Sequence, residues 1–180
     1  MTSNTLIAII AVVAALALVG LAVVGFVLWQ RSMKQELQRL LGRREAIHSA
    51  LRTVERVVSS LAEASDGDLV TFALDGDAED RRALGEVAMQ MRIQRDELEA
   101  QALPKALHES ADALGAAAGA LAEQTERTET VEGVEVLDAL AAIEFSSVRT
   151  QLLRADVAVR ELAERYGVDE AAFYGGGMYI

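Results

Sequence analysis

The sequence predicts an all-α protein in which a single N-terminal transmembrane helix continues into an antiparallel helical bundle. Three features predict it: an uncharged apolar run near the N-terminus, apolar positions recurring every three or four residues through the remaining chain, and a single proline. This spacing is the period of an amphipathic α-helix. We expect four bundle helices, or three if the chain only kinks at Pro104, and no β-sheet of consequence.

The apolar run extends from Leu6 to Trp29, twenty-four residues without a charged side chain, amide or hydroxyl. A hydrocarbon core about 30 Å thick needs about 20 apolar residues in a helix, so the run is long enough to span it. No basic side chain precedes the run, and no polar sequence follows Ala15-Leu-Ala17, which argues against a cleaved signal peptide. We therefore expect an uncleaved signal anchor, with an extracytoplasmic N-terminus at residues 1–5 and a transmembrane helix at residues 6–29.

Basic residues gather directly after the run, where five stand against one acidic residue, Glu36. Because Lys and Arg are in excess on the cytoplasmic side of membrane proteins, residues 30–166 are predicted to be cytoplasmic, at the cell membrane. Membrane lipid is an expected partner, since Lys and Arg each gain about 1 kcal/mol near an anionic leaflet. The predicted anchor and topology residues are Trp29, Arg31, Lys34, Arg39, Arg43 and Arg44.

The cytoplasmic part is acidic. The formal net charge is -11, and all charged residues lie after Gln30. The flank Arg31–Arg44 carries +4, which leaves -15 on the rest of the domain. Nucleic-acid phosphates favour clustered Lys and Arg, so this charge argues against nucleic acid as a partner. The chain has no cysteine, so no disulfide argues for an extracytoplasmic domain.

The first bundle helix is predicted from about Arg31 to about Ala64, continuous with the apolar run. Its apolar positions form a heptad pattern in which Arg44 takes the one expected apolar position that is missing. After it, Leu69–Leu74 is expected to be extended or a loop, and Asp77 to cap the second helix. The heptad positions are Met33, Leu37, Leu40, Ile47, Leu51, Val54, Val58 and Leu61.

The second helix is predicted to run to about Leu103, where Pro104 should break or kink it. The apolar positions before and after Pro104 differ in register, which favours a turn. The third helix is rich in alanine and glycine, which permits close approach of a neighbour. A polar link is expected over Glu123–Gly133, with Thr128 or Thr130 capping the last helix, which should stop at Gly167. That helix has the most regular apolar stripe, typical of a core: Ala141, Phe145, Val148, Leu152, Ala155, Val159, Leu162 and Tyr166.

No residue pattern predicts catalysis, a cofactor or a metal, so we expect no enzyme. Glu45-Ala-Ile-His48 is one copy of the E-x-x-H step of di-metal bundles, which need two, and the other histidine, His108, lacks the preceding glutamate. Asp66-Gly-Asp68 and Asp75-Gly-Asp77 lack the order and closing glutamate of a calcium loop, which makes them loop and capping carboxylates.

The C-terminal segment, residues 167–180, is predicted to be a flexible aromatic and glycine-rich tail. One interpretation is a frayed terminus whose aromatic side chains fold back on the bundle. The other is a short docking peptide for a partner or for the bilayer. Its expected anchors are Phe173, Tyr174, Met178, Tyr179 and Ile180.

The layout of an N-terminal span with an outside N-terminus and a cytoplasmic helical bundle resembles that of LemA-type membrane proteins. The chain lacks their helix pattern with tyrosine and asparagine, so no residue role follows from the resemblance. We expect a membrane-anchored scaffold or interaction module with protein partners, self-associating through the apolar stripes of its first and last helices. The alternative is a signal-coupling module, in which the continuous first helix passes a bias from lipid or a neighbouring span to the bundle.

Overall fold

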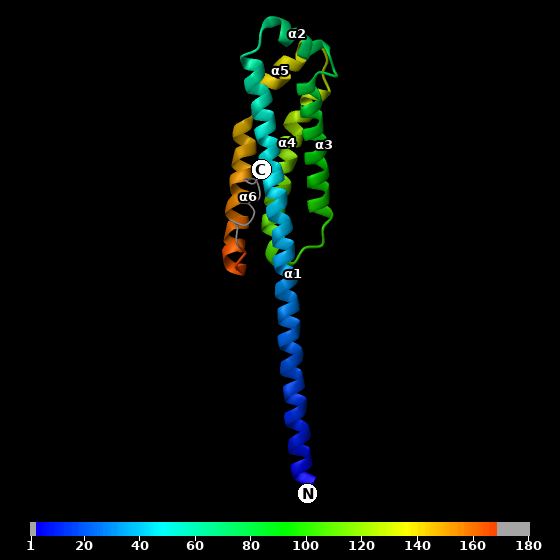
Figure 1. Cartoon of the computed structure of the whole chain (residues 1–180), viewed down its shortest axis with the longest axis vertical. Coiled ribbons are helices and arrows are strands. Elements are labelled where there is room, and N and C mark those ends of the chain that lie inside the picture. The colour runs from blue at the N-terminus through cyan, green and yellow to red at the C-terminus, as the bar shows by residue number, and fades with distance from the viewer. Residues whose placement is uncertain (1–2, 169–180) are drawn as a thin grey trace, which may run out of the picture. The chain divides into compact units, whose positions relative to one another are not determined.

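A computed structural model describes the backbone of residues 3–168 and the side chains of residue 16 and residues 18–168. Every secondary-structure element in this part of the chain is helical, so the predicted all-α class is confirmed (Figure 1). Among the described residues, no helix combines the length and the apolarity needed to cross a membrane. The helices are α1 (Ser3–Ala62), α2 (Asp66–Leu74), α3 (Glu79–Ala100), the 3-10 turn η1 (Lys105–Leu107), α4 (His108–Glu129), α5 (Glu135–Ala141) and α6 (Phe145–Tyr166).

The chain divides into two compact units, Met1–Glu36 and Leu37–Ile180. The described part of the first unit belongs to α1, which runs without a break from Ser3. Its large apolar side chains between Leu16 and Trp29 are 44% to 70% exposed, and the rings of Phe26 and Trp29 lie 6.0 Å apart. This part of the helix therefore presents an apolar surface.

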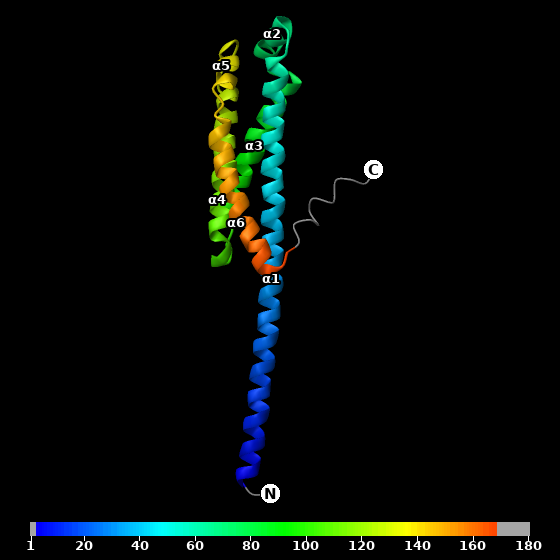
Figure 2. The same ribbon diagram turned by 90° about the vertical axis from the view of Figure 1, so that its left-hand side faces the viewer.

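The second unit is a four-helix bundle built from α1 after Leu37, α3, α4 and α6, with successive long helices running in opposite directions (Figures 1 and 2). Helix α4 packs against both α3 and α6. An ion pair between Arg43 and Glu97 joins α1 to α3, and one between Arg44 and Asp156 joins α1 to α6. The four helices thus close a ring of neighbours around one core. The short helices α2 and α5 contact one another and lie at one end of the bundle.

The apolar stripes predicted for the first and last helices form the core of this bundle. In α1, the heptad positions from Leu37 to Val54 are buried, while Val58 and Leu61 are half-buried. In α6, the stripe is buried from Val148 to Leu162. These side chains are covered by helices of the same chain, so the stripes serve intramolecular packing.

Pro104 separates α3 from α4, and the four-helix alternative is the one observed. Helix α3 ends at Ala100, three residues earlier than predicted, and η1 begins directly after the proline. In α4, alanine and glycine positions such as Gly115, Ala117 and Ala118 are buried. Small side chains bring neighbouring backbones close together, which explains how α4 packs tightly against two helices.

Two predictions around the short helices are wrong. Leu69–Leu74 is neither extended nor a loop, because Ser65 starts helix α2: its hydroxyl accepts a hydrogen bond from the amide of Asp68 at 3.3 Å. Helix α3 begins at Glu79 after Ala78, with no side-chain cap, whereas Asp77 had been the expected cap. The amide of Asp77 instead donates to the carboxylate of Asp75 at 2.9 Å, which closes a turn before α3.

The expected polar link after α4 is also wrong in its extent. Helix α4 continues to Glu129, with Gln124, Thr125 and Thr128 buried, and neither Thr128 nor Thr130 caps a following helix. The predicted last helix is split into α5 and α6 by a break after Ala141. At this break the amide of Glu144 donates to the side-chain oxygen of Gln124 at 3.2 Å, so α4 holds the interruption in place. Gly167 ends α6 as predicted, in the left-handed conformation with φ 61°.

Candidate functional site

A groove lies between the N-terminal end of α4 and the C-terminal half of α6 and has a volume of about 660 Å³. Figure 2 shows the two helices diverging toward the C-terminal end of α6. Small side chains line the α4 side, including Ala106 in η1 and Ala113. The lining residues are Ala106, Glu109, Ser110, Ala113, Gln151, Leu153, Arg154, Val157, Ala158, Glu161, Leu162 and Arg165.

Two large apolar side chains on α6 are exposed along this groove. Leu153 is 64% exposed and Val157 48%, although both lie on a helix whose core-facing stripe is separate and buried. They are four residues apart, so they lie on one side of α6, one turn apart. Together with Ala158 and the alanines of α4, they give the groove a continuous apolar side. Burial of such side chains by a partner would gain free energy.

The groove also carries charge of both signs. Arg154, Glu161 and Arg165 come from α6, and Glu109 comes from the first turn of α4. In the part of the chain that the structure describes, none of these four side chains makes an ion pair with another. They are exposed at the surface, so they can pair with charges on an occupant. An occupant with an apolar centre and flanking charges fits this arrangement.

A serine hydroxyl lies at the base of the groove without a hydrogen-bond partner. Ser110 is 1% exposed, and its Oγ is buried and unsatisfied. Leaving a buried polar group unpaired costs about 1–3 kcal/mol. Most buried serines avoid this cost by bonding to a backbone carbonyl or to another side chain. Because this oxygen is covered by the surrounding side chains, it is an unsatisfied group beneath the surface of the groove.

A second feature is a polar cluster inside the bundle, where Arg44 of α1 meets Asp156 of α6. The Nε of Arg44 donates to Oδ1 of Asp156 at 2.6 Å, and the side chains are only 8% and 16% exposed. Nε2 of His48 lies 3.0 Å from Oδ1 and 3.2 Å from Oδ2 of the same carboxylate. The arginine that interrupts the heptad pattern is thus neutralised by an acid from another helix, as a buried charge requires.

The residues considered for metal binding have other roles. Glu45 pairs with Arg52 at 2.7 Å, so Glu45 and His48 of the E-x-x-H step turn to different partners. His108 contacts the carbonyl oxygen of Leu103 at 2.8 Å. Among the described residues, no group of three or more His, Cys, Asp or Glu side chains could hold a metal ion. Asp66 and Asp68 lie in the first turn of α2 rather than in a loop, and the side chain of Asp68 accepts a hydrogen bond from the capping residue Ser65 at 2.7 Å.

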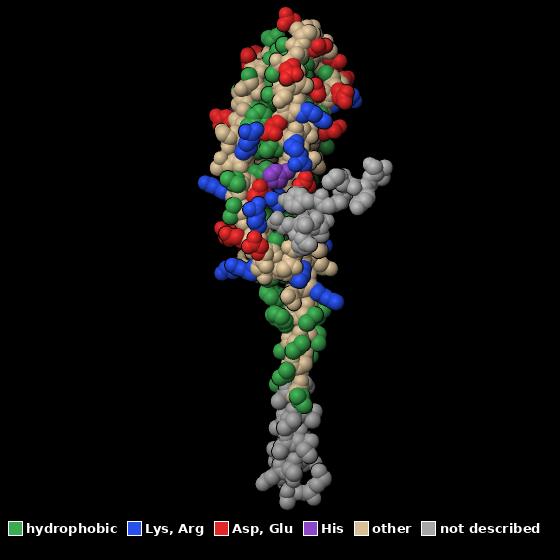
Figure 3. Space-filling model, turned by 60° about the vertical axis from the view of Figure 1, so that its left-hand side comes forward, with side chains coloured by type: hydrophobic (Ala, Val, Ile, Leu, Met, Phe, Trp, Pro, Cys, Tyr) green, Lys and Arg blue, Asp and Glu red, His purple; other side chains and the backbone are tan. Residues whose placement is uncertain are grey.

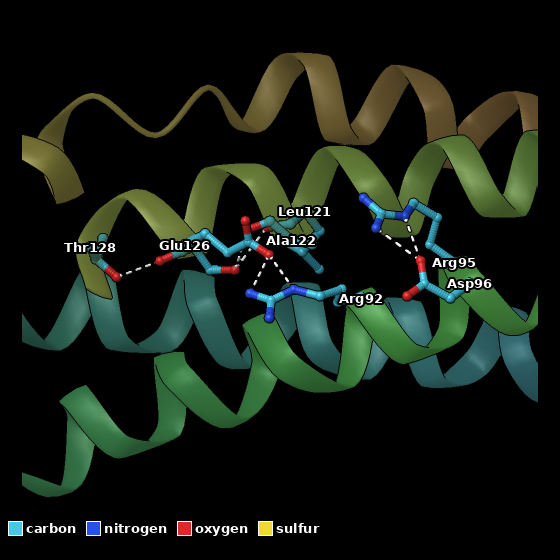
Figure 4. A network of polar contacts seen from close by, with 8 residues as sticks. Arg92, Arg95, Asp96, Leu121, Ala122, Glu126 and Thr128 are labelled. Atoms are coloured by element: carbon cyan, nitrogen blue, oxygen red, sulfur yellow. Dashed lines mark hydrogen bonds and ion pairs between the residues drawn. The ribbon is translucent and has the colours of Figure 1, made fainter. Parts of the chain in front are cut away.

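Exposed ion pairs lie along the contact between α3 and α4 (Figure 4). Arg92 of α3 pairs with Glu126 of α4 at 2.6 Å. Arg95 pairs with its neighbour Asp96 at 2.8 Å, and this hydrogen bond raises the pKa of Arg95 above its usual value. The stem of Arg95 lies across Gly119, where an added Cβ would come within 3.2 Å of its Cδ. A smaller recess of about 330 Å³ lies beside these contacts, lined by residues of both helices that include Leu98, Gly115 and Ala116.

The predicted anchor residues do not all lie in one kind of environment. Arg31 and Arg39 are exposed, and Lys34 is half-buried. Arg43 pairs with Glu97 at 3.2 Å and Arg44 with Asp156, so these two also serve the bundle. The five expected anchors of the tail, from Phe173 to Ile180, lie outside the described residues.

The groove and Asp156 were not found by sequence reasoning. A signal for the polar cluster existed, because an arginine in an apolar heptad position requires an acidic partner, but periodicity could not say which acid. A signal for the groove was the pair Leu153 and Val157, which lies off the main stripe of α6. Figure 3 shows one face of the bundle, on which acidic side chains gather toward the upper end and basic side chains lie mostly below them, around a histidine.

No protein-family model, no curated protein and no solved structure matches the chain significantly. The fold and the groove define a class: an all-helical protein built on a four-helix bundle, with an apolar, charge-rimmed groove on its surface. Within that class, function follows from what this chain's own surfaces can bind.

Proposed function

We propose that the protein is a single-pass, membrane-anchored helical bundle that acts as a scaffold or interaction module at the cytoplasmic face of the cell membrane. The observation that carries this proposal is the continuity of α1. One helix leads from the apolar run, Leu6–Trp29, into the core of the bundle. Such a helix ties a folded domain to a bilayer without a separate linker.

The apolar surface of α1 supports the anchor. From Leu16 to Trp29, the described large apolar side chains are exposed, and residues 6–15 and 17 continue the run in the sequence. Exposure of so much contiguous apolar surface to water is unfavourable, whereas lipid would solvate it. The basic residues after Trp29 favour a cytoplasmic bundle by the positive-inside rule.

The anchor is tested by extraction of membranes with alkaline carbonate. Leu21→Arg combined with Val24→Arg should release the protein into the soluble fraction, because a charge within a span is unfavourable, by up to about 2.5–3.5 kcal/mol at its centre. Leu74→Arg is the matched control, since Leu74 is as exposed as Leu21 but lies on α2. Release of the unmodified chain by carbonate would overturn the anchor.

The orientation is tested by labelling single cysteines, which the chain otherwise lacks. With a membrane-impermeant maleimide on intact cells, Asn4→Cys should be labelled and Asp77→Cys should react only after lysis. The reverse pattern would place the bundle outside the cell and contradict the positive-inside assignment.

The interaction role is tested at the groove with a photo-crosslinking amino acid. The positions are Val157 on α6 and, as a matched control, Ile93 on α3, because both are 48% exposed. A protein partner bound in the groove should crosslink at position 157 and not at 93. Equal crosslinking at both positions would show nonspecific contact and overturn the assignment of the groove as the binding surface.

The alternative function, signal coupling between membrane and bundle, is favoured by the same unbroken helix. A Gly-Pro insertion after Ser32 should interrupt α1, because proline removes a backbone donor and glycine lowers helix stability. If α1 transmits a bias, crosslinking at position 157 should change when the insertion is present. Unchanged crosslinking would favour a simple tether.

A further inference from the structure

We propose that residues 169–180 of the same chain bind in the groove between α4 and α6. This inference rests on the proposed function in one respect: the groove proposed there to bind a partner is here proposed to bind a segment of the same chain. The docking itself requires neither the membrane nor a partner. The structure supplies three grounds: where the described chain stops, how far the remaining chain can reach, and what the groove would accept.

The described chain stops at one end of the groove. Arg165, a lining residue, lies one residue before the end of α6. Gly167 then adopts φ 61°, and the amide of Val168 donates to the carbonyl of Ala163 at 2.9 Å. This pair of features ends the helix and turns the chain aside, instead of letting it continue along the α6 axis. The described chain therefore ends at Val168, three residues after a lining residue of the groove.

The remaining chain is long enough to fill the groove. Twelve residues follow Val168, and an extended chain spans about 3.3–3.6 Å per residue, or about 40 Å in total. Along α6 the groove runs from Gln151 to Arg165, which at 1.5 Å per residue is about 21 Å. The groove is therefore roughly half as long as the fully extended segment, so some residues of the segment remain for a turn.

The composition of the segment matches that of the groove. Its large side chains are apolar or aromatic. They form one pair, Phe173-Tyr174, and one triplet, Met178-Tyr179-Ile180, which are separated by three glycines. The groove offers Leu153, Val157 and neighbouring alanines for contact. A volume of about 660 Å³ is that of a site for a small ligand, so it would take a few of these side chains.

Charge agrees with this occupant. The only charged residues of the segment, Asp169 and Glu170, are acidic and follow Arg165 closely. Arg154 and Arg165 make no ion pair with another described residue, so both can receive these carboxylates.

Disulfide trapping in the full-length chain in detergent micelles tests the proposal. One variant combines Ala113→Cys in the groove with Gly176→Cys, which keeps every apolar anchor of the segment. The control combines Ala116→Cys with Gly176→Cys: Ala116 lies on the same helix but lines the side of α4 that faces α3, and it is more exposed than Ala113. Oxidation with copper phenanthroline is followed on non-reducing gels, and peptide mass spectrometry identifies the bond.

The expected result is an intrachain disulfide that forms about tenfold faster for the 113–176 pair than for the 116–176 pair, because docking raises the local concentration at one side of α4 only. The advantage should disappear when Tyr174→Ser and Met178→Ser are added, a change outside the bundle that should leave its thermal melting curve intact. Equal rates for the two pairs would overturn the proposal. Disulfide-linked dimers as the main product would also overturn it, because the groove would then hold the segment of a second copy. Neither result depends on membrane extraction or on crosslinking at position 157, so a failure here is separate from a failure of the proposed function.

Discussion

Arg44 and Asp156 lie 112 positions apart in the sequence and form a hydrogen-bonded ion pair of 2.6 Å between α1 and α6. Arg44 stands in the heptad pattern of α1 where an apolar side chain is expected, and the two side chains of the pair are only 8% and 16% exposed. A buried charge needs its counter-charge, so these two helices are joined at this point by a covered polar contact.

The first prediction concerns this pair. Asp156→Ala should lower the free energy of unfolding by about 3 kcal/mol, because it removes the carboxylate that faces the covered guanidinium of Arg44. Arg149→Ala is the matched control: it removes an ion pair with Glu55 between the same two helices, but at an exposed position, and should cost less than about 1 kcal/mol. Urea unfolding in detergent, followed by circular dichroism, gives both values. Equal losses for the two variants would contradict the special role of the covered pair.

The second prediction concerns the contact between α3 and α4 at Gly115. A Cβ added there would meet only the Cβ of Leu98, at an ordinary distance of 3.9 Å. Gly115→Ala should therefore raise the free energy of unfolding by about 0.5–1 kcal/mol, since alanine favours the helix. Gly115→Leu should lower it by about 1–3 kcal/mol, because the larger side chain must push the helices apart. Thermal melting of both variants measures these changes in stability. A stabilising effect of Gly115→Leu would show that α3 and α4 are less tightly packed than the structure indicates.

The third prediction concerns Arg81, whose guanidinium donates to the backbone carbonyls of Ala73, Thr128 and Val131 at 3.3–3.5 Å. Arg81→Met should speed hydrogen exchange in α2 and in residues 130–134, because the carbonyls at the ends of two helices lose their donor. Arg82→Met is the control at the adjacent, exposed position and should leave exchange unchanged. An effect spread evenly over the bundle would argue against a local role for Arg81.

The fourth prediction concerns the break between α5 and α6. Gln124→Ala should cost about 1 kcal/mol of stability and expose the amide of Glu144 to exchange, because that amide loses its acceptor. Gln124→Glu keeps an acceptor oxygen at the same position, so it should preserve the protection of this amide. Hydrogen exchange of the peptide containing Glu144, measured by mass spectrometry, compares the two variants. Equal protection in both would show that the side chain of Gln124 does not protect the amide of Glu144.

The long helices were predictable because each one buries a stripe that repeats over several turns. The stripe of α6 from Val148 to Leu162 and the stop at Gly167 needed only the period of a helix and the conformational freedom of glycine. The short helices α2 and α5 were not predictable, because seven to nine residues form too few helical turns to show a repeating apolar pattern. Leu69–Leu74 reads equally as strand or helix, and only the cap by Ser65 decides between them.

The candidate site was predictable in smaller part. The position of Arg44 indicated a buried charge, but the acid that meets it depends on how α6 packs against α1. The groove arises where α4 and α6 diverge, and the small side chains of Ala106 and Ala113 contribute only because of that divergence. Local patterns contain no information on the separation of two helices, so this surface had to come from the structure.

The position of α4 between α3 and α6 has a consequence for how this sequence can change. A larger side chain on α4 would contact a neighbouring helix on more than one side. Helices α3 and α6 each keep a water-facing surface, where substitutions change the stability little. Over evolutionary time α4 should therefore drift slowly in side-chain volume, with alanine exchanging mainly for glycine or serine. Related chains can be sought by this helix of small residues followed by a break and a strongly amphipathic last helix, even when the rest of the sequence has diverged.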